Sequence, residues 1–155
     1  MTQLHVLSDL RDVPDFAAIV AERVWRAWWE ADGVALATLR ARLDESLGSG
    51  AIPATFVAHA EGCFLGCVAL IASDVDRRPS LTPWVAALWV EPDTRRQGLG
   101  AALTAHAIEA AFAAGHAQVY LAAKPALAPY YLVRGWARME ADVDGLDILI
   151  RRRGG

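Results

Sequence analysis

The sequence predicts an α/β (α+β) fold, in which a mixed, mostly antiparallel and twisted sheet of about six or seven strands carries helices on both faces. The chain has 155 residues, of which 55% are hydrophobic, so it can bury the core of a single domain, expected over residues 1–155. Strand-like and helix-like segments alternate along it without repeats or linkers. A strand–helix–strand crossover over residues 85–123 predicts one parallel pair, and the short turns elsewhere predict antiparallel pairs.

The first half of the chain is expected to form a strand, two helices and a hairpin. A short strand is predicted at residues 4–7. Helices are predicted at residues 16–30 and at about residues 35–47, because their apolar residues recur at the spacing of one helix face. Two alternating segments at residues 55–60 and 64–72, joined by a tight turn, predict the hairpin.

The second half begins with a strand at residues 85–90, which is apolar and rich in β-branched and aromatic residues. Pro92 ends this strand because proline has no amide to donate to a sheet. The remaining predicted elements are a helix at about residues 98–114, a strand at 118–123, a short helix at 125–133, and strands at 136–140 and 146–151.

Composition argues against several classes of protein. The net charge of -3 gives no overall basic field, so no nucleic-acid partner is expected. The longest apolar run, residues 63–72, is too short to cross a bilayer, so no membrane partner is expected. The first residues are polar and of mixed charge, unlike a signal peptide, which favours a cytoplasmic protein. Cys63 and Cys67 are expected to be reduced core residues, and no metal site is expected.

The segment RRQGLG at residues 95–100 lies where the strand at 85–90 ends and the helix at 98–114 begins. Glycines at such a turn let the backbone curl and approach a ligand closely. The first amides of a helix have no partner within the helix, and they carry partial positive charge. This turn is therefore expected to bind a phosphate group.

Two motifs resemble those of the GNAT acetyltransferase superfamily. Arg95-x-x-Gly98-x-Gly100 after a strand is similar to its acyl-CoA signature, and Tyr131-x-x-x-Gly135-Trp136 is similar to a second family motif further along the chain. The resemblance covers most of the chain, and it implies the GNAT fold and acetyl-CoA as co-substrate. The residues that it implies for coenzyme binding are Leu88, Trp89, Val90, Arg95, Arg96, Gln97, Gly98, Leu99, Gly100, Ala101 and Lys124.

The same resemblance gives Tyr131 the role of general acid. A phenol with a pKa of about 10 can protonate a leaving thiolate whose conjugate acid has a pKa of about 8.5. Tyr130 is expected to pack.

Lys124 stands where the family usually has Asn, and the central strand carries no acid before Glu91. The general base stays open among a small set of carboxylates and a water chain. These carboxylates are Glu30, Asp32, Asp74, Asp76 and Glu91.

The acceptor pocket of this superfamily is built by the first two helices and the loops around the central strand. Trp25, Trp28 and Trp29 lie there, and packing is preferred for them over an aromatic wall for an amine. At least one of the adjacent pair Trp28 and Trp29 must point away from the main apolar stripe.

Together these observations favour an acetyl-CoA-dependent N-acetyltransferase that acts by direct attack of a primary amine, of a small molecule or a protein, in a ternary complex. One alternative is an acyl-CoA-binding module without turnover. A dinucleotide-binding domain is the other, although the glycines do not read Gly-x-Gly-x-x-Gly. A homodimer stays open as an assembly.

Overall fold

One sheet of seven strands, in the order β1-β2-β3-β4-β5-β7-β6, forms the centre of the computed structural model. The structure describes residues 4–154. Residues 1–3 and 155 lie outside the described part of the chain. They are the ends of the predicted single domain, and residues 1–3 also begin the polar N-terminal segment that is unlike a signal peptide. Neighbouring strands are antiparallel except β4 and β5, which are parallel. The predicted mixed, mostly antiparallel sheet is confirmed.

The elements follow the predicted order. The strands are β1 (Val6–Asp9), β2 (Ala54–Ala60), β3 (Cys63–Ile71), β4 (Trp84–Val90), β5 (Gln118–Ala123), β6 (Ala137–Val143) and β7 (Leu146–Arg152). The α-helices are α1 (Ala17–Val24), α2 (Leu36–Asp44), α3 (Leu99–Ala113) and α4 (Ala128–Leu132).

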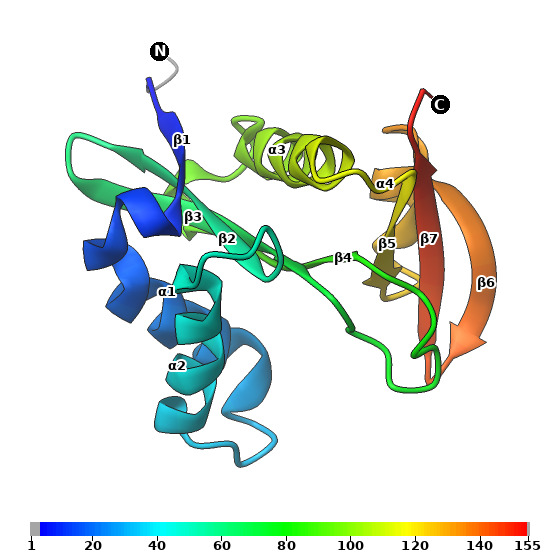
Figure 1. Cartoon of the computed structure of the whole chain (residues 1–155), viewed down its shortest axis with the longest axis horizontal. Coiled ribbons are helices and arrows are strands. Elements are labelled where there is room, and N and C mark those ends of the chain that lie inside the picture. Colours follow the sequence, from blue (N-terminus) through cyan, green and yellow to red (C-terminus); the bar gives the residue numbers. More distant parts are fainter. Residues whose placement is uncertain (1–3, 155) are drawn as a thin grey trace.

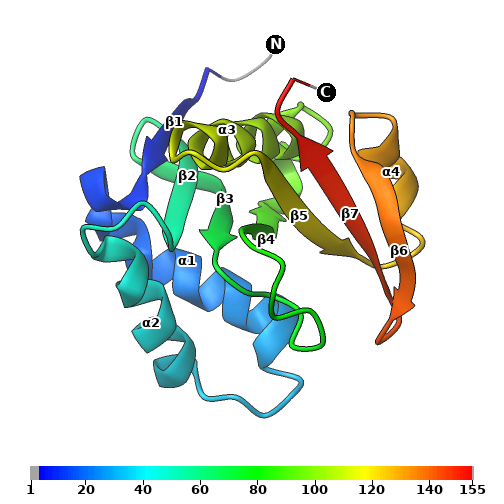
Figure 2. The ribbon, with the colours of Figure 1, turned by 45° about the vertical axis from the view of Figure 1, so that its right-hand side comes forward.

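Helices cover both faces of the sheet, as predicted. In Figure 1, α1 and α2 lie below the sheet and α3 lies above it, and the turned view in Figure 2 agrees. The core under α3 includes Val68, Leu103 and Leu149, and side chains of α4 pack against it. The core under α1 and α2 includes Val20 and Val57. Each apolar helix face is therefore buried against one face of the sheet.

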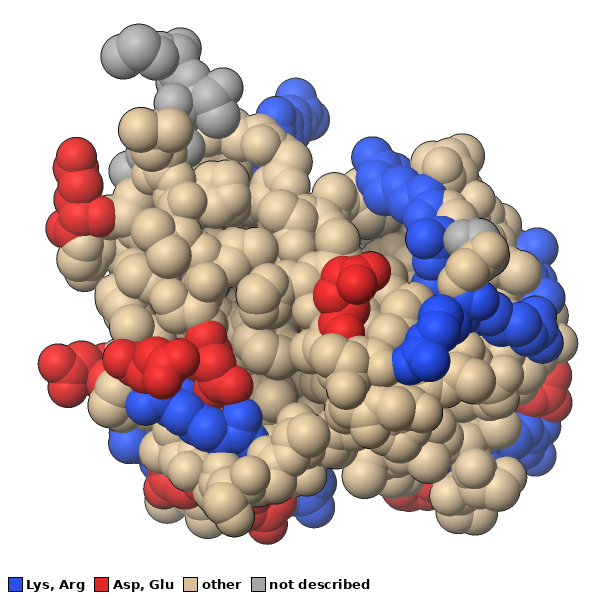
Figure 3. All heavy atoms as spheres, turned by 45° about the horizontal axis from the view of Figure 1, so that its top comes forward, with Lys and Arg blue, Asp and Glu red and all other residues tan. Residues whose placement is uncertain are grey.

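Charged side chains are unevenly distributed over the face that carries α3. Basic side chains gather on the right-hand half of Figure 3, the half that β5, β6, β7 and α4 form. Most of the acidic side chains visible in this view lie on the other half. The chain therefore presents a local positive surface despite a net charge of -3.

Three details differ from the sequence-based expectation. The first helix does not stay α-helical to its end, because Trp25–Trp29 forms a π-turn in which the amide of Glu30 donates to the carbonyl of Trp25 (2.8 Å). The α-helical part of the short helix before Gly135 is limited to Ala128–Leu132. The prediction that both cysteines are core residues is wrong for Cys63, which is exposed beside the hairpin turn, whereas Cys67 is buried.

Strands β4 and β5 separate soon after they begin. Within residues 4–154, Trp84 opposite Tyr120 is the single register pair between them. On its other side β4 stays paired with β3, but the register shifts near Ala87, whose φ of 53° lies in the left-handed region. A bulge of this kind bends the strand. The edge of β4 that faces β5 is therefore unpaired at Leu88, Trp89 and Val90.

None of the helices described between residues 4 and 154 has the length and apolar character that crossing a membrane requires.

At Gly66 of β3, the neighbouring strand β4 leaves no room for a side chain. A Cβ at this position would lie 2.7 Å from the carbonyl oxygen of Trp89 and 3.2 Å from Cδ1 of Leu103. We expect Gly66→Ala to lower the free energy of unfolding by about 1–3 kcal/mol, because the strands must shift to admit the methyl group. Urea denaturation measures this. Gly50→Ala is the control, since its Cβ would lie 3.4 Å from the carbonyl oxygen of Ile52, and equal stability of both variants would contradict the expectation.

Candidate functional site

The turn between β4 and α3 presents free backbone amides. Gly98 precedes α3 with a φ of 82°, which glycine adopts without strain. The first bond within the helix runs from the amide of Ala102 to the carbonyl of Gly98 (3.0 Å). The amides of Leu99, Gly100 and Ala101 therefore have no acceptor inside the helix, and they form the positive end of its dipole.

The two glycines of the turn leave room in different ways. A Cβ on Gly98 would meet no atom within 4 Å, so this position opens outward. A Cβ on Gly100 would lie 3.5 Å from the hydroxyl oxygen of Tyr130 and 3.9 Å from side-chain atoms of Leu88 and Val90. Gly100 thus faces the gap beside β4. The turn and the open strand edge form one continuous surface.

The arginines of the turn are placed differently from one another. Arg95 donates from Nε to the carbonyl of Val90 (2.8 Å), and its guanidinium lies 4.8 Å from the ring centroid of Trp89. Arg96 is exposed and has a φ of 65°, which is unusual for a residue with a side chain. Gln97 is also exposed. A positive φ at a residue with a side chain, as at Arg96, is frequent at functional sites.

Lys124 lies across the gap, directly after β5. Its carbonyl accepts hydrogen bonds from the amides of Leu127 (2.8 Å) and Ala128 (3.1 Å), and so it anchors the start of α4. Its side chain is exposed. The predicted coenzyme-binding residues thus come from the carboxyl ends of β4 and β5 and from the start of α3. Because β4 and β5 are parallel, these segments lie at the same end of the sheet.

The two adjacent tyrosines of α4 are placed differently, and Tyr130 is the one whose hydroxyl reaches this region. Tyr130 is 37% exposed and, as the Gly100 distance shows, its hydroxyl approaches the turn, so it does more than pack. Tyr131 is half-buried against the core under α3, with its ring centroid 6.3 Å from that of Trp136. Burial, and to a lesser extent the neighbouring Tyr130, raise the pKa of the Tyr131 phenol. Tyr131 therefore keeps its proton through the neutral range, as a general acid must.

On the other face of the sheet, a cavity of about 600 Å³ adjoins the end of β4. It is lined by Arg23, Arg26, Phe64, Leu65, Trp89, Glu91, Pro92, Asp93 and Thr94. Its aromatic walls are Phe64 and Trp89, whereas Trp25, Trp28 and Trp29 do not line it. Trp28 points outward and is 43% exposed, and Trp25 and Trp29 pack against the core under α1, so the packing interpretation holds for those two.

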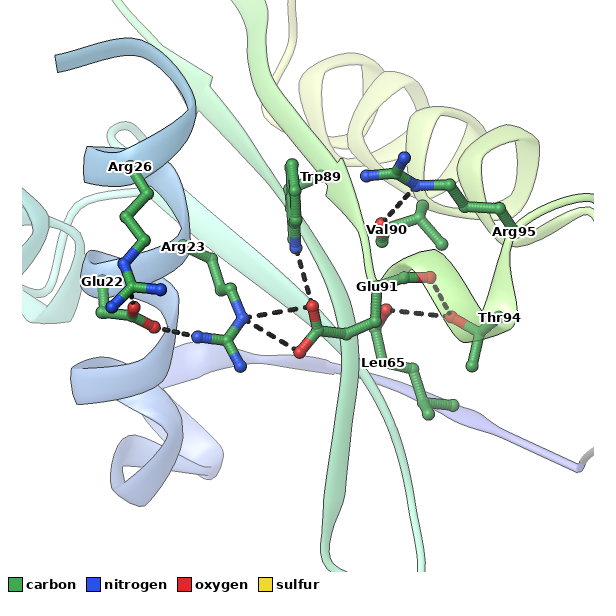
Figure 4. Close-up of polar contacts among 9 residues, drawn as sticks. All are labelled: Glu22, Arg23, Arg26, Leu65, Trp89, Val90, Glu91, Thr94 and Arg95. Carbon is green, nitrogen blue, oxygen red and sulfur yellow. Dashed lines mark hydrogen bonds and ion pairs between the residues drawn. The ribbon is translucent and has the colours of Figure 1, made fainter. Parts of the chain in front are cut away.

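Glu91 is held firmly inside this cavity. Its carboxylate accepts hydrogen bonds from Nε of Arg23 (3.0 and 3.1 Å) and from Nε1 of Trp89 (3.1 Å), as Figure 4 shows. Arg23 also pairs with Glu22, which pairs with Arg26 (2.7 Å). Sequence reasoning missed Arg23, because nothing local in the sequence signals a partner 68 positions away.

The other candidate bases lie elsewhere. Glu30 and Asp32 are exposed at the end of the first helix. Asp74 lies in the loop before β4, and desolvation together with the neighbouring charge of Asp76 raises the pKa of its carboxyl. Neither pair lines the cavity beside β4, which leaves Glu91 as the candidate on that side.

Cys67 is not available as a nucleophile. Burial and the negative charge of Glu91 raise the pKa of its thiol to about 12, against a weaker opposing effect of a hydrogen bond from the backbone of Trp89. The thiolate is the reactive form, and it is absent at neutral pH.

Comparison with known proteins gives a consistent result. The model of the acetyltransferase (GNAT) family matches residues 21–136. No curated protein sequence matches the chain. Among solved structures, an aminoglycoside 6'-acetyltransferase type Ii is similar with a TM-score of 0.72 at 14% identity, with 95% of this chain and 96% of that chain covered.

Two further structures show the same fold. A GNAT-family acetyltransferase from Streptococcus pneumoniae has a TM-score of 0.71 at 18% identity, with 97% and 100% of the two chains covered. An N-acetylglutamate synthase from Neisseria gonorrhoeae, complexed with coenzyme A and N-acetyl-glutamate, has a TM-score of 0.65 at 20% identity, with 98% of this chain and 36% of that chain covered.

The Gly98 position offers a direct test of the turn. Asn adopts positive φ more readily than other residues with a side chain, so Gly98→Asn should cost less than about 1 kcal/mol of stability. Its side chain would project into the ligand surface, and we expect the affinity for coenzyme A to fall by about tenfold or more, measured by calorimetry.

Gly145 provides the matched control, because it has the same φ of 82° and equally open surroundings in the turn between β6 and β7. Gly145→Asn should keep wild-type affinity. An unchanged affinity in Gly98→Asn would show that the turn is not the binding surface.

Proposed function

Because the chain belongs to the acetyltransferase (GNAT) family, we propose that it moves an acetyl group from acetyl-CoA to a primary amine of a small molecule or a protein, by direct attack in a ternary complex. One observation supports this most: an unpaired strand edge at Leu88, Trp89 and Val90 runs directly into a helix start with free amides. Few ligands need both features side by side. Coenzyme A needs both, because its arm carries amides and its nucleotide end carries a pyrophosphate.

The residues present fit this ligand. The backbone of Leu88, Trp89 and Val90 can pair with the amides of the pantetheine arm, as an added strand pairs with a sheet edge. The amides of residues 99–101 and the exposed side chains of Arg96 and Gln97 can bind the pyrophosphate. Lys124 borders the same gap from the end of β5. Arg95 can keep the strand end in place through Val90 and Trp89.

The thioester supplies the activated acetyl group, and the protein supplies positioning and proton transfer. We assign to Tyr131 the donation of a proton to sulfur as the C–S bond breaks. Its raised pKa keeps the phenol protonated, and its partial burial removes competing water. Direct attack is favoured over an acyl-cysteine, because the Cys67 thiol stays neutral.

The cavity beside Glu91 suits the acceptor. Arg23 and Arg26 of α1 line it, so it adjoins the face of the sheet opposite α3, and an amine could reach the acetyl group from the side that the coenzyme does not occupy. Its arginines are already neutralised by Glu22 and Glu91, and a protonated amine would therefore not be repelled. Trp89 and Phe64 offer aromatic faces to such a cation.

Thiol release from acetyl-CoA with a panel of amines tests the function. We expect turnover with at least one primary amine and formation of an amide product, identified by mass spectrometry. Binding of acetyl-CoA without turnover for any amine would favour the alternative, a non-catalytic acyl-CoA-binding module. Absence of binding would overturn both readings.

Tyr131→Phe tests the general acid. We expect kcat to fall by about 100-fold at neutral pH with little change in affinity for acetyl-CoA. The deficit should narrow above about pH 8.5, because the leaving thiolate then needs no proton. Steady-state rates measured from about pH 6 to about pH 10, a range that includes the ordinary pKa values of a thiol and a phenol, test both effects.

Tyr130→Phe is the matched variant, since it removes a neighbouring hydroxyl that points at Gly100. It should alter coenzyme affinity more than kcat. The opposite pattern, with a large loss of kcat in Tyr130→Phe and none in Tyr131→Phe, would move the acid role to Tyr130.

A further inference from the structure

The gap between β4 and β5 is closed at its inner end by two large rings. Trp84 and Tyr120 form the single register pair between these strands within residues 4–154, and their ring centroids lie 5.5 Å apart. Both side chains are buried, and the amide of Tyr120 also donates to the carbonyl of Pro83 (3.0 Å). The unpaired edge of β4 therefore runs from the turn before α3 toward the ring of Trp84.

The closed end is fixed by a core of its own. The indole Nε1 of Trp84 donates to the carbonyl of Leu81 (2.7 Å), which fixes the orientation of the ring. Further buried side chains pack around Trp84 and Tyr120, namely Val75, Val143, Ile148 and Ile150. Side chains in a close-packed core have little room to move aside. A group that reaches this end of the gap therefore meets a rigid wall.

The side chains beside the gap are large on one face of the sheet and small on the other. On the face that carries α3, Val85 and Leu121 belong to the buried core, so this face is filled. On the opposite face, which carries the rings of Trp84 and Tyr120, β4 and β5 present Ala87 and Ala122. Both alanines are only partly buried. Space next to the open edge is therefore available on this face, and it ends at Trp84.

We infer that Trp84, backed by Tyr120, limits the acyl group of the thioester to acetyl or propionyl. This inference rests on the proposed function, in which the pantetheine arm enters from the turn before α3 and lies along residues 88–90. The sulfur and its acyl group then lie beyond Leu88, toward Trp84. At about 3.3 Å per residue, about 13 Å of strand separates these two residues. The end of the arm, the sulfur and the acyl chain must share this length.

A longer acyl chain has two ways to fit, and both are unfavourable. It can press against the indole of Trp84, and forcing extra methylene groups into a packed core is destabilising. It can instead turn out over Ala87 and Ala122, on the face from which the acceptor amine approaches. Trp84 thus determines acyl specificity without touching the atoms that react.

Calorimetry with coenzyme A, acetyl-CoA, butyryl-CoA and hexanoyl-CoA tests this limit. For the wild type we expect acetyl-CoA to bind at least as tightly as coenzyme A, and the two longer thioesters to bind about tenfold more weakly than acetyl-CoA, or worse. In Trp84→Leu the smaller side chain opens the inner end, so the penalty on butyryl-CoA should shrink by about fivefold or more, with the affinity for coenzyme A unchanged. Trp28→Leu is the matched control, because Trp28 is exposed at the end of the first helix, and it should keep the wild-type ratios.

A second variant narrows the gap instead, because the full burial of Trp84 makes its replacement a risk to folding. Ala122→Val adds bulk beside the gap, and valine is well suited to a strand. We expect its affinity for acetyl-CoA to fall by about fivefold or more relative to its affinity for coenzyme A.

The other outcomes overturn one proposal or the other. Equal wild-type affinity for acetyl-CoA and hexanoyl-CoA overturns the limit and leaves the proposed function standing. Wild-type ratios in a folded Trp84→Leu overturn the role of Trp84, and so do wild-type ratios in Ala122→Val if Trp84→Leu does not fold. A wild type that binds none of the ligands overturns the proposed function itself.

Discussion

The separation of β4 from β5 is the constraint on which the rest of the site depends. A strand inside a sheet normally has both edges paired, because buried peptide groups without partners are costly. Here β4 pairs with β3 on both sides of its bulge but meets β5 at Trp84 alone within the described residues. The bulge at Ala87 bends the strand at that point. The backbone groups of Leu88, Trp89 and Val90 that face β5, apart from the Val90 carbonyl that accepts from Nε of Arg95, then require either water or an extended ligand.

The two halves of the sheet are nevertheless held together. Side chains of α3 pack across the gap, so that Leu103 shares one core with Val68 on β3 and with Leu121 on β5. On the opposite face, the rings of Trp84 and Tyr120 lie 5.5 Å apart at the point where the strands still pair. The gap can therefore persist without a ligand, because α3 bridges it and Trp84 closes its inner end.

Most of the fold could be predicted from local features of the sequence. The strand, turn and helix around Gly98 follow from residues within a few positions of one another, and they could be predicted. The exposure of Cys63 could not, since regular alternation gives Cys63 and Cys67 the same environment. The register shift between Ala58 and His59 breaks that alternation, and Phe64 shares a core with Cys67 despite a spacing of three.

The parts of the site that the sequence did not reveal depend on contacts between distant segments. The pairing of Arg23 with Glu91 joins α1 to the end of β4, and the packing of Arg151 on Gly135 joins β7 to the segment after α4. Neither contact is indicated by the spacing of residues in the sequence or by its composition. Arg134 and Arg151 read in the sequence as ordinary surface arginines, and only the fold brings them to one cavity between α3 and α4.

The two sides of β4 differ in net charge. On the α1 side, Arg23 and Arg26 are neutralised by Glu22 and Glu91, so the cavity there has little net charge. On the α3 side, Arg134 and Arg151 have no such partners among the described residues. A highly anionic donor would be attracted to the α3 side, and a cationic amine would be repelled from that side but not from the α1 side. Opposite entry then follows from electrostatics as well as from shape, and it keeps the acceptor from competing with the coenzyme for the same surface.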